Sequence, residues 1–249
     1  MSRNSFVSVL YQKLSLIIFL TGKIIRFIFF ISFLIFLLRG TKVLAGYTLE
    51  QSVFFFLTFN LIDILAQFLF REVYRFRPLI VNGGFDLILV KPINALFRVL
   101  MGGADVIDLI TLPPLVYALF YVGRLLQPSL IQIFSYLLLL GSGLIIATAF
   151  HIAVLALAIL TLEIDHTIMI YRDFVALGRF PVDIYGEPIK SILIYLLPVG
   201  LMITVPAKAL MGLVSWTGIL VSLVVASVTI LASLKVWHLA LKQYTSASS

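Results

Sequence analysis

Long apolar runs, most of them bounded by one or two cations, dominate the chain. They are continuous rather than alternating, and they lie at about 24–38, 51–70, 104–122, 130–162 and 218–237. A helix that crosses a hydrocarbon core needs roughly 20 such residues, whereas the strands of a membrane barrel alternate apolar and polar positions. The pattern therefore predicts an all-α polytopic membrane protein with about six transmembrane helices in one domain, residues 1–249.

The region 163–217 allows two interpretations. By hydropathy alone, 163–188 is a polar segment outside the bilayer and 189–210 is the fifth span. Pro198 and Pro206 nevertheless divide that apolar run into pieces too short to cross separately. In the alternative, 165–181 is a polar-lined fifth helix and 189–212 is a re-entrant pair that enters from the outside before the last span.

The two ends of the chain are more polar than its centre. Residues 1–23 predict an amphipathic interfacial lead-in, and 239–249 form a polar, Ser-rich tail. Overall, 62% of residues are hydrophobic and only 12% are charged. A soluble domain of 249 residues could not bury that much apolar surface, so the lipid bilayer must be its solvent.

The cations predict the orientation. If both termini are cytoplasmic, eleven Lys and Arg residues lie on the cytoplasmic side and four on the external side. The external ones are Arg39, Lys42, Arg124 and Lys208, and three further cations in 163–217 are not counted. Positive residues favour the cytoplasmic side, so both termini are expected there. The net charge of +7 is spread singly over the ends of apolar runs, which argues against nucleic-acid binding.

The segment 71–98 joins the second and third spans and carries five cations against two acids. Gly83 and Gly84 should end or bend one helix, Asp86 can cap the next, and Lys91-Pro92 should stop it. Short apolar stretches lie between these turn signals, including Phe85. We therefore expect a short helix parallel to the membrane that fits a socket on a soluble partner, rather than a mere connector.

A few polar residues lie inside the apolar runs. Asn60, Asp63 and Gln67 are spaced so that they share one helical face. Because an intramembrane Asp costs about 2.5–3.5 kcal/mol, this face is expected to form either a hydrogen-bonded seam between helices or the lining of a substrate path. His151, with Thr148 close before it, is expected to form an interhelical polar pair rather than a proton relay.

No motif indicates an enzyme. The chain has no GxxxxGK[ST] phosphate-binding loop and no nucleophile-elbow sequence. Its three His residues lack carboxylate neighbours at metal-ligand spacing, apart from Asp165 and Glu163 close before His166. It contains no Cys. We therefore predict no catalytic residue, no cofactor and no bound metal.

Several stretches resemble the type-2, exporter-class permeases of ATP-binding-cassette transporters, in their compact six-span branch. They include 46–50 (GYTLE), with Tyr in place of a more usual Trp, 82–94 (NGGFDLILVKPIN, which contains Asn94), 180–185, 197–200 and 205–207. Phe180 stands where Tyr is commoner before Pro181. The resemblance covers nearly the whole chain.

The resemblance implies a half-transporter in the bacterial inner membrane that pairs with a second copy or a related permease. It also implies a cytosolic ATPase subunit, a coupling helix within 71–98, and a re-entrant pair on the external side. Export as the direction of transport comes from this resemblance alone. The alternatives are a membrane scaffold without a transport cycle, and a small ion or proton-coupled carrier in which His151 or Asp63 would titrate.

Overall fold

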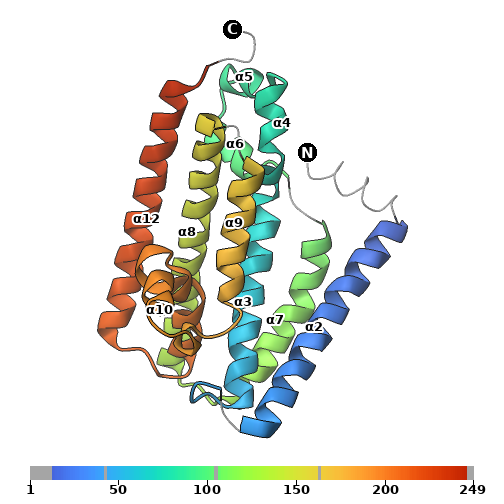
Figure 1. Cartoon of the computed structure of the whole chain (residues 1–249), viewed down its shortest axis with the longest axis vertical. Helices are drawn as coiled ribbons and strands as arrows, with labels where there is room; N and C mark the ends of the chain where they lie inside the picture. The colour runs from blue at the N-terminus through green and yellow to red at the C-terminus, as the bar shows by residue number, and fades with distance from the viewer. Residues whose placement is uncertain (1–12, 42–43, 104–105, 162–163, 246–249) are drawn as a thin grey trace.

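The computed structural model describes residues 13–41, 44–103, 106–161 and 164–245. Within these ranges the protein is a bundle of helices (Figure 1), with one isolated bridge between Leu44 and Tyr47 and no strand. In chain order the elements are α2 (Lys13–Thr41), α3 (Leu49–Phe70), η1 (Arg71–Arg75), α4 (Phe76–Val81), α5 (Gly84–Leu89), α6 (Ala95–Met101), α7 (Val106–Leu125), α8 (Leu130–Thr161), α9 (Ile164–Leu177), η2 (Val182–Ile184), α10 (Ile189–Ser191), η3 (Ile192–Leu196), η4 (Gly200–Thr204), α11 (Val205–Leu210) and α12 (Trp216–Gln243).

Five stretches of helix in the described ranges are long and apolar enough to cross a membrane: Ile17–Leu38, Leu49–Val81, Ile107–Leu125, Leu130–Thr161 and Trp216–Gln243. The fold prediction of an all-α polytopic membrane protein is therefore confirmed. The helix α8 has 32 residues, about 48 Å at 1.5 Å per residue, which exceeds a hydrocarbon core of about 30 Å. It runs unbroken, and contacts η1, α4 and α6 beyond the apolar layer.

The bundle has two distinct ends. We call the end that carries η1, α4, α5 and α6 the loop end, and the end that carries the turn at 44–48 between α2 and α3 the turn end. At the turn end, Thr48 caps α3 through a reciprocal capping box with Gln51. The C-terminal part of α12 returns to the loop end, where Tyr244 packs on Phe85 at 5.1 Å between ring centres. The first turns of α2 and the last turns of α12 thus lie at the same end.

The structure agrees with the second interpretation of 163–217. A helix, α9, lies beside α8, and the two arms 189–196 and 200–210 meet at a bend of 76°. Asp183, before the first arm, contacts both Tyr47 of the turn end and Lys208 near the end of the second arm. The bent pair thus starts and finishes near the same carboxylate at the turn end, whereas α9, with 14 residues, is shorter than the candidate spans.

Two boundaries differ from the sequence prediction. The helix α2 runs without a break from Lys13 through residue 23 to Thr41, so the expected division between a lead-in and a first span is absent from its described part. Residues 1–12 of the lead-in lie outside the described residues. At the other terminus α12 extends to Gln243, and Ala240 is fully buried. The start of the expected polar tail is therefore packed helix.

Lys23 of α2 forms an ion pair with Asp108 at the start of α7. The Asp108 side chain is only 3% exposed, whereas that of Lys23 is 37% exposed. Lys23 and Arg26 are two of the eleven cations that the sequence analysis counts as cytoplasmic, but both lie within the apolar stretch Ile17–Leu38. Pairing with a carboxylate on a neighbouring helix reduces the cost of holding this ammonium group there.

Candidate functional site

The loop end is built from short helices, as the turn signals predicted. The helix α4 ends at Val81, and Gly83 adopts φ +69°, a left-handed conformation that glycine tolerates without strain. The helix α5 ends at Leu89, before Lys91-Pro92. The expected capping role of Asp86 is wrong: Gly83 occupies the N-cap position, and Asp86 lies in the first turn of α5.

The same end contains a cap that was not predicted. Asn94 precedes α6, and its side-chain oxygen accepts a hydrogen bond from the backbone N–H of Phe97 at 2.9 Å. At the end of the same helix, Arg98 pairs with Glu72 of η1 at 3.3 Å. These contacts fasten α6 to the segment that continues α3, so the short helices form a rigid unit with the second span.

The helix α5 is anchored on one side by aromatic packing. Phe85 is fully buried and lies 5.0 Å from Phe76 and 6.3 Å from Trp237, measured between ring centres. Burial, together with the nearby Asp86 carboxylate, raises the pKa of the Tyr244 phenol to about 12. The buried side of α5 is therefore in direct contact with the ends of α4 and α12.

The other side of this unit is apolar and exposed. We call docking surface five exposed apolar side chains on α5, on α6 and between them: Leu87, Leu89, Val90, Ile93 and Phe97. Val90 is 80% exposed, and Leu87 and Phe97 are both 64% exposed. They belong to the loop end (top of Figure 1), and an exposed apolar group of this kind is typical of a binding surface.

The polar face of α3 is only partly buried. Asn60 is 6% exposed, and its amide donates to the backbone carbonyl of Phe56 in its own helix at 2.7 Å. This hydrogen bond lies within α3 itself. Asp63 and Gln67 are half-buried. Asp63 interacts electrostatically with Tyr171 of α9 and with Arg179, which follows α9 in the chain. The polar face of α3 is therefore directed toward the α9 region.

His151 lies in a buried aromatic cage, 2% exposed, with ring centres 4.8 Å from Phe70 and 5.0 Å from Tyr171. Its Nδ1 lies 2.8 Å from the carbonyl oxygen of Ala147, and Thr148 donates to the carbonyl of Leu144 at 2.7 Å. Both partners belong to α8 itself. The predicted interhelical pair of His151 and Thr148 is therefore wrong.

A groove beside α2 carries the main charged feature at membrane depth. It has a volume of about 410 Å³ and is lined by Gly22, Ile25, Arg26, Phe29, Phe30, Phe33, Phe56 and Arg179. The rings of Phe30 and Phe56 stack at 3.9 Å, near the middle of α3. An arginine at the centre of a span costs about 2.5–3.5 kcal/mol on insertion scales. Arg26 lies within the apolar stretch Ile17–Leu38, so its position requires an explanation, whereas Arg179 lies in the segment after α9.

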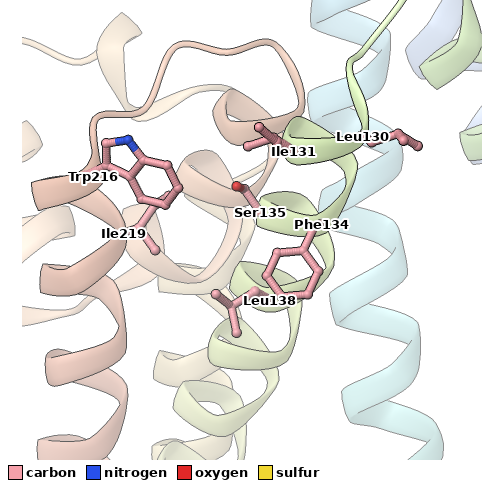
Figure 2. A pocket seen from close by; sticks show the side chains of 7 residues that line it. All are labelled: Leu130, Ile131, Phe134, Ser135, Leu138, Trp216 and Ile219. Carbon is pink, nitrogen blue, oxygen red and sulfur yellow. The ribbon is translucent and has the colours of Figure 1, made fainter.

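A second pocket lies at the turn end between α8 and α12. Figure 2 shows its seven lining residues, from Leu130 on one helix to Trp216 and Ile219 on the other. Its volume is about 320 Å³, and the lining is almost entirely apolar, with Ser135 contributing a hydroxyl. Such a lining suits contact with acyl chains and offers no group to orient a polar substrate.

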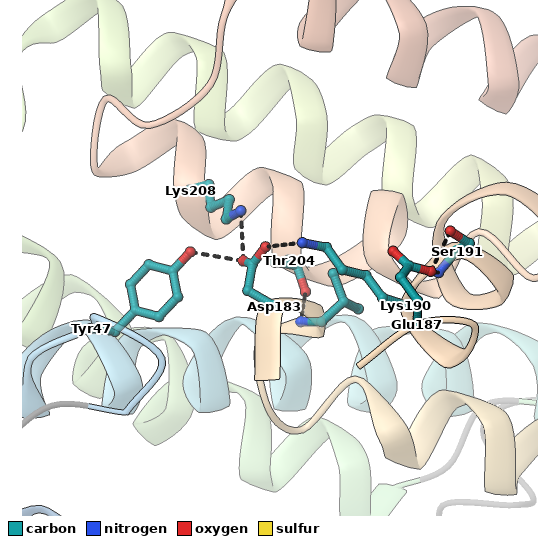
Figure 3. Close-up of polar contacts among 8 residues, drawn as sticks. Tyr47, Asp183, Glu187, Lys190, Ser191, Thr204 and Lys208 are labelled. Atoms are coloured by element: carbon teal, nitrogen blue, oxygen red, sulfur yellow. Dashed lines mark hydrogen bonds and ion pairs between the residues drawn. The ribbon is translucent and has the colours of Figure 1, made fainter. Parts of the chain in front are cut away.

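The turn end is held together by Asp183 (Figure 3). One carboxylate oxygen lies 2.6 Å from the Lys208 ammonium and accepts a hydrogen bond from the Tyr47 hydroxyl at 2.8 Å; the other lies 3.3 Å from Lys190. Thr204 also accepts a hydrogen bond from the backbone N–H of Val182 at 3.2 Å. The carboxylate therefore ties the α2–α3 turn to both arms of the bent pair.

This cluster has a clear electrostatic signature. Burial alone would raise the pKa of Asp183, but the hydrogen bonds from Lys208 and Tyr47 outweigh it and hold the pKa below its usual range. Burial and the same carboxylate raise the pKa of the Tyr47 phenol. The sequence prediction missed this cluster. Its signal was four polar residues, Tyr47, Asp183, Lys190 and Lys208, in short segments between apolar runs.

No group of three or more His, Cys, Asp or Glu side chains with metal-binding geometry occurs among the described residues. The fold and these surfaces together define a multi-pass helical membrane protein with a compact helical unit at one end. Comparison with known families then supplies the identification. The sequence model of the family described as ABC-2 family transporter protein matches residues 23–248, and the chain belongs to this family.

The protein is thus a membrane permease of the ABC-2 transport class, and the family resemblance of the sequence is confirmed. Permeases of this family are transport components of the membrane that generally act with an ATPase subunit. No curated protein and no solved structure matches the chain.

Proposed function

We propose that the protein is the membrane-spanning subunit of an ATP-binding-cassette exporter of the bacterial inner membrane, driven by a separate cytosolic ATPase. The docking surface is the observation that carries this proposal. Its five exposed apolar side chains lie on α5, on α6 and on the connection between them, and buried residues of α5 and α6 pack in the core. The orientation with the loop end and both termini in the cytoplasm rests on the excess of cations there.

The packing around α5 supports a route for mechanical coupling. Phe85 contacts Phe76, Trp237 and Tyr244, which belong to α4, α12 and the segment after α12. The helix α4 in turn continues α3 through η1. A displacement of α5 by a docked ATPase would therefore act on two spans at once, because close-packed aromatic groups transmit displacement with little compression.

The polar face of α3 is partly open in the described part of one chain. Its residues Asp63 and Gln67 are only half-buried. We infer that two permeases, identical or related, pair so that this face borders the transported molecule. In this proposal Asp63 and Gln67 of α3 serve as lining residues, whereas Asn60 and His151 serve packing.

The test is co-purification of ATP hydrolysis with the full-length permease from its native membranes. The double variant Leu87→Asp/Val90→Asp should lose at least tenfold of the co-purified ATPase activity, because two desolvated carboxylates would oppose an apolar interface. The control is Leu213→Asp, an exposed leucine at the turn end, 54% accessible, which should retain the activity.

Membrane insertion and the unfolding temperature should be unchanged in both variants, since these side chains make few contacts within the chain. If the loop-end variant retained the same ATPase activity as the unmodified protein, the docking role would be refuted.

A further inference from the structure

In the described ranges, no ion pair joins either of the two arginines in the groove beside α2 to a carboxylate. Arg26 projects from α2, and Arg179 follows α9. The Nε atom of Arg179 is buried and donates to no acceptor in the described part of the chain. The guanidinium carbon of Arg179 lies 5.8 Å from the ring centre of Phe59, so an aromatic face covers one side of it.

The charge around these arginines remains positive. The groups whose charge acts most on Arg179 are Arg26, Arg172 and Asp63, in addition to Tyr185. In the described ranges, no ion pair within 4.0 Å joins Asp63 to either arginine of the groove. The negative charge of Asp63 thus acts at longer range on a group of three arginines, Arg26, Arg172 and Arg179. The remaining positive charge favours binding of an anion.

The walls of the groove are apolar and open to the bilayer. Phe29 is 75% exposed and Phe33 is 42% exposed, while Phe30 and Phe56 form the stacked inner wall. Only 6% of the most apolar part of the stretch Ile17–Leu38 is buried within the chain. The outer face of α2 therefore contacts lipid or another membrane component. A ligand could therefore enter sideways, from within the membrane.

We propose that this groove binds an anionic amphiphile, with its phosphate or carboxylate head group on Arg26 and Arg179 and its acyl chain along Phe29 and Phe33. Guanidinium groups suit this role because each can offer two parallel N–H donors to a phosphate or carboxylate. The assignment of this amphiphile as the transported substrate rests on the proposed function. The same chemistry is offered by a membrane lipid that stays bound, so the experiment separates the two.

Binding is measured by native mass spectrometry of the full-length permease with phosphatidylglycerol or phosphatidylcholine of identical acyl chains. The unmodified protein should retain phosphatidylglycerol at least tenfold better. Arg26→Gln/Arg179→Gln should abolish that preference. The control Arg124→Gln/Lys242→Gln removes the same charge outside the groove and should keep it. Equal retention of both lipids by the unmodified protein, or an unchanged preference in the groove variant, overturns the proposal.

Transport is measured as ATP-dependent movement of a fluorescent phosphatidylglycerol across vesicles that contain the permease with its co-purified ATPase. Movement that requires ATP and is lost in the groove variant supports a transported amphiphile. Charge-selective binding without such movement overturns the assignment as substrate. The binding measurement needs no ATPase, so failure of the docking test refutes the proposed function without affecting the head-group site.

Cross-linking tests whether protein covers the groove instead. The chain contains no Cys, so a single introduced thiol reports without background. A Phe29→Cys variant should give little disulfide-linked dimer in native membranes if lipid occupies the groove. Efficient cross-linking of two copies at this position would show that a second permease fills it, and would overturn the proposal.

Discussion

Replacing Asp183 by Asn should loosen the turn end more than any other single change of charge there. The variant removes the partner of Lys208 at 2.6 Å, weakens the hydrogen bond from Tyr47 at 2.8 Å and releases Lys190 at 3.3 Å. The side chains of Asp183 and Lys208 are 21% and 23% exposed. Breaking an exposed ion pair costs up to about 1 kcal/mol of stability, and breaking a buried one costs about 3–5 kcal/mol. Because this pair is only partly exposed, the cost of breaking it should lie between these limits.

We expect a loss of about 2–3 kcal/mol in the free energy of unfolding at pH 7, most of it from the contact with Lys208. By the relation for soluble domains of this length, the unfolding temperature should fall by roughly 4–12 °C. The assay is thermal unfolding of the purified permease in detergent. Asp173→Asn is the matched control, because Asp173 is an exposed acid of α9. It should change the unfolding temperature little.

The pH dependence gives a second criterion. The pKa of Asp183 is lower in the folded state than in the unfolded state. The carboxylate therefore stabilises the fold at pH values above its unfolded-state pKa of about 3.9, and this stabilisation is lost as the pH falls through the folded-state pKa. The difference between the unmodified protein and Asp183→Asn should thus stay constant from about pH 5 to 8 and shrink below about pH 4. An Asp183→Asn variant as stable as Asp173→Asn would refute the reasoning.

Two further substitutions test packing at opposite ends, each against a matched control by thermal unfolding. A Cβ at Gly143 would lie 2.4 Å from the carbonyl oxygen of Met202, so Gly143→Ala should destabilise the protein by about 1–3 kcal/mol. Gly141→Ala, with nothing within 4 Å, should not; equal effects would contradict the close contact of α8 with the bent pair. Phe85→Ala should cost about 3–5 kcal/mol because its ring is fully buried, whereas Phe97→Ala, 64% exposed, should cost almost nothing. Similar losses in the two Phe variants would argue against α5 as an anchored helix.

Local sequence patterns were enough to predict the helices and breaks that depend mainly on their own residues. The predicted second span 51–70 corresponds to α3 at Leu49–Phe70, and the breaks at Gly83 and Lys91-Pro92 lie where α4 and α5 end. Apolar length, backbone restriction and the left-handed preference of glycine are properties of a few consecutive residues. They need no knowledge of the neighbours in space.

The hydrogen-bond partners of the polar residues were harder to predict, because most of the candidate partners come close only when the chain folds. His151 was expected to bond across helices and instead meets the carbonyl of Ala147 one turn before it. Asn60 likewise bonds within its own helix. In a membrane helix the nearest unfilled acceptor is often the backbone of the preceding turn, and helical spacing alone does not show whether a neighbouring helix offers a better one.

The composition by itself determined that this chain lives in a bilayer as a bundle of helices, since no other solvent accommodates so much continuous apolar sequence. Its motifs placed it in a transport family. The tertiary structure alone showed that the two arms at 189–196 and 200–210 bend by 76° and that Asp183 meets Tyr47, 136 positions earlier in the chain. It alone placed Arg26 beside Arg179. Such pairs form where helices pack, and packing depends on the whole set of side chains.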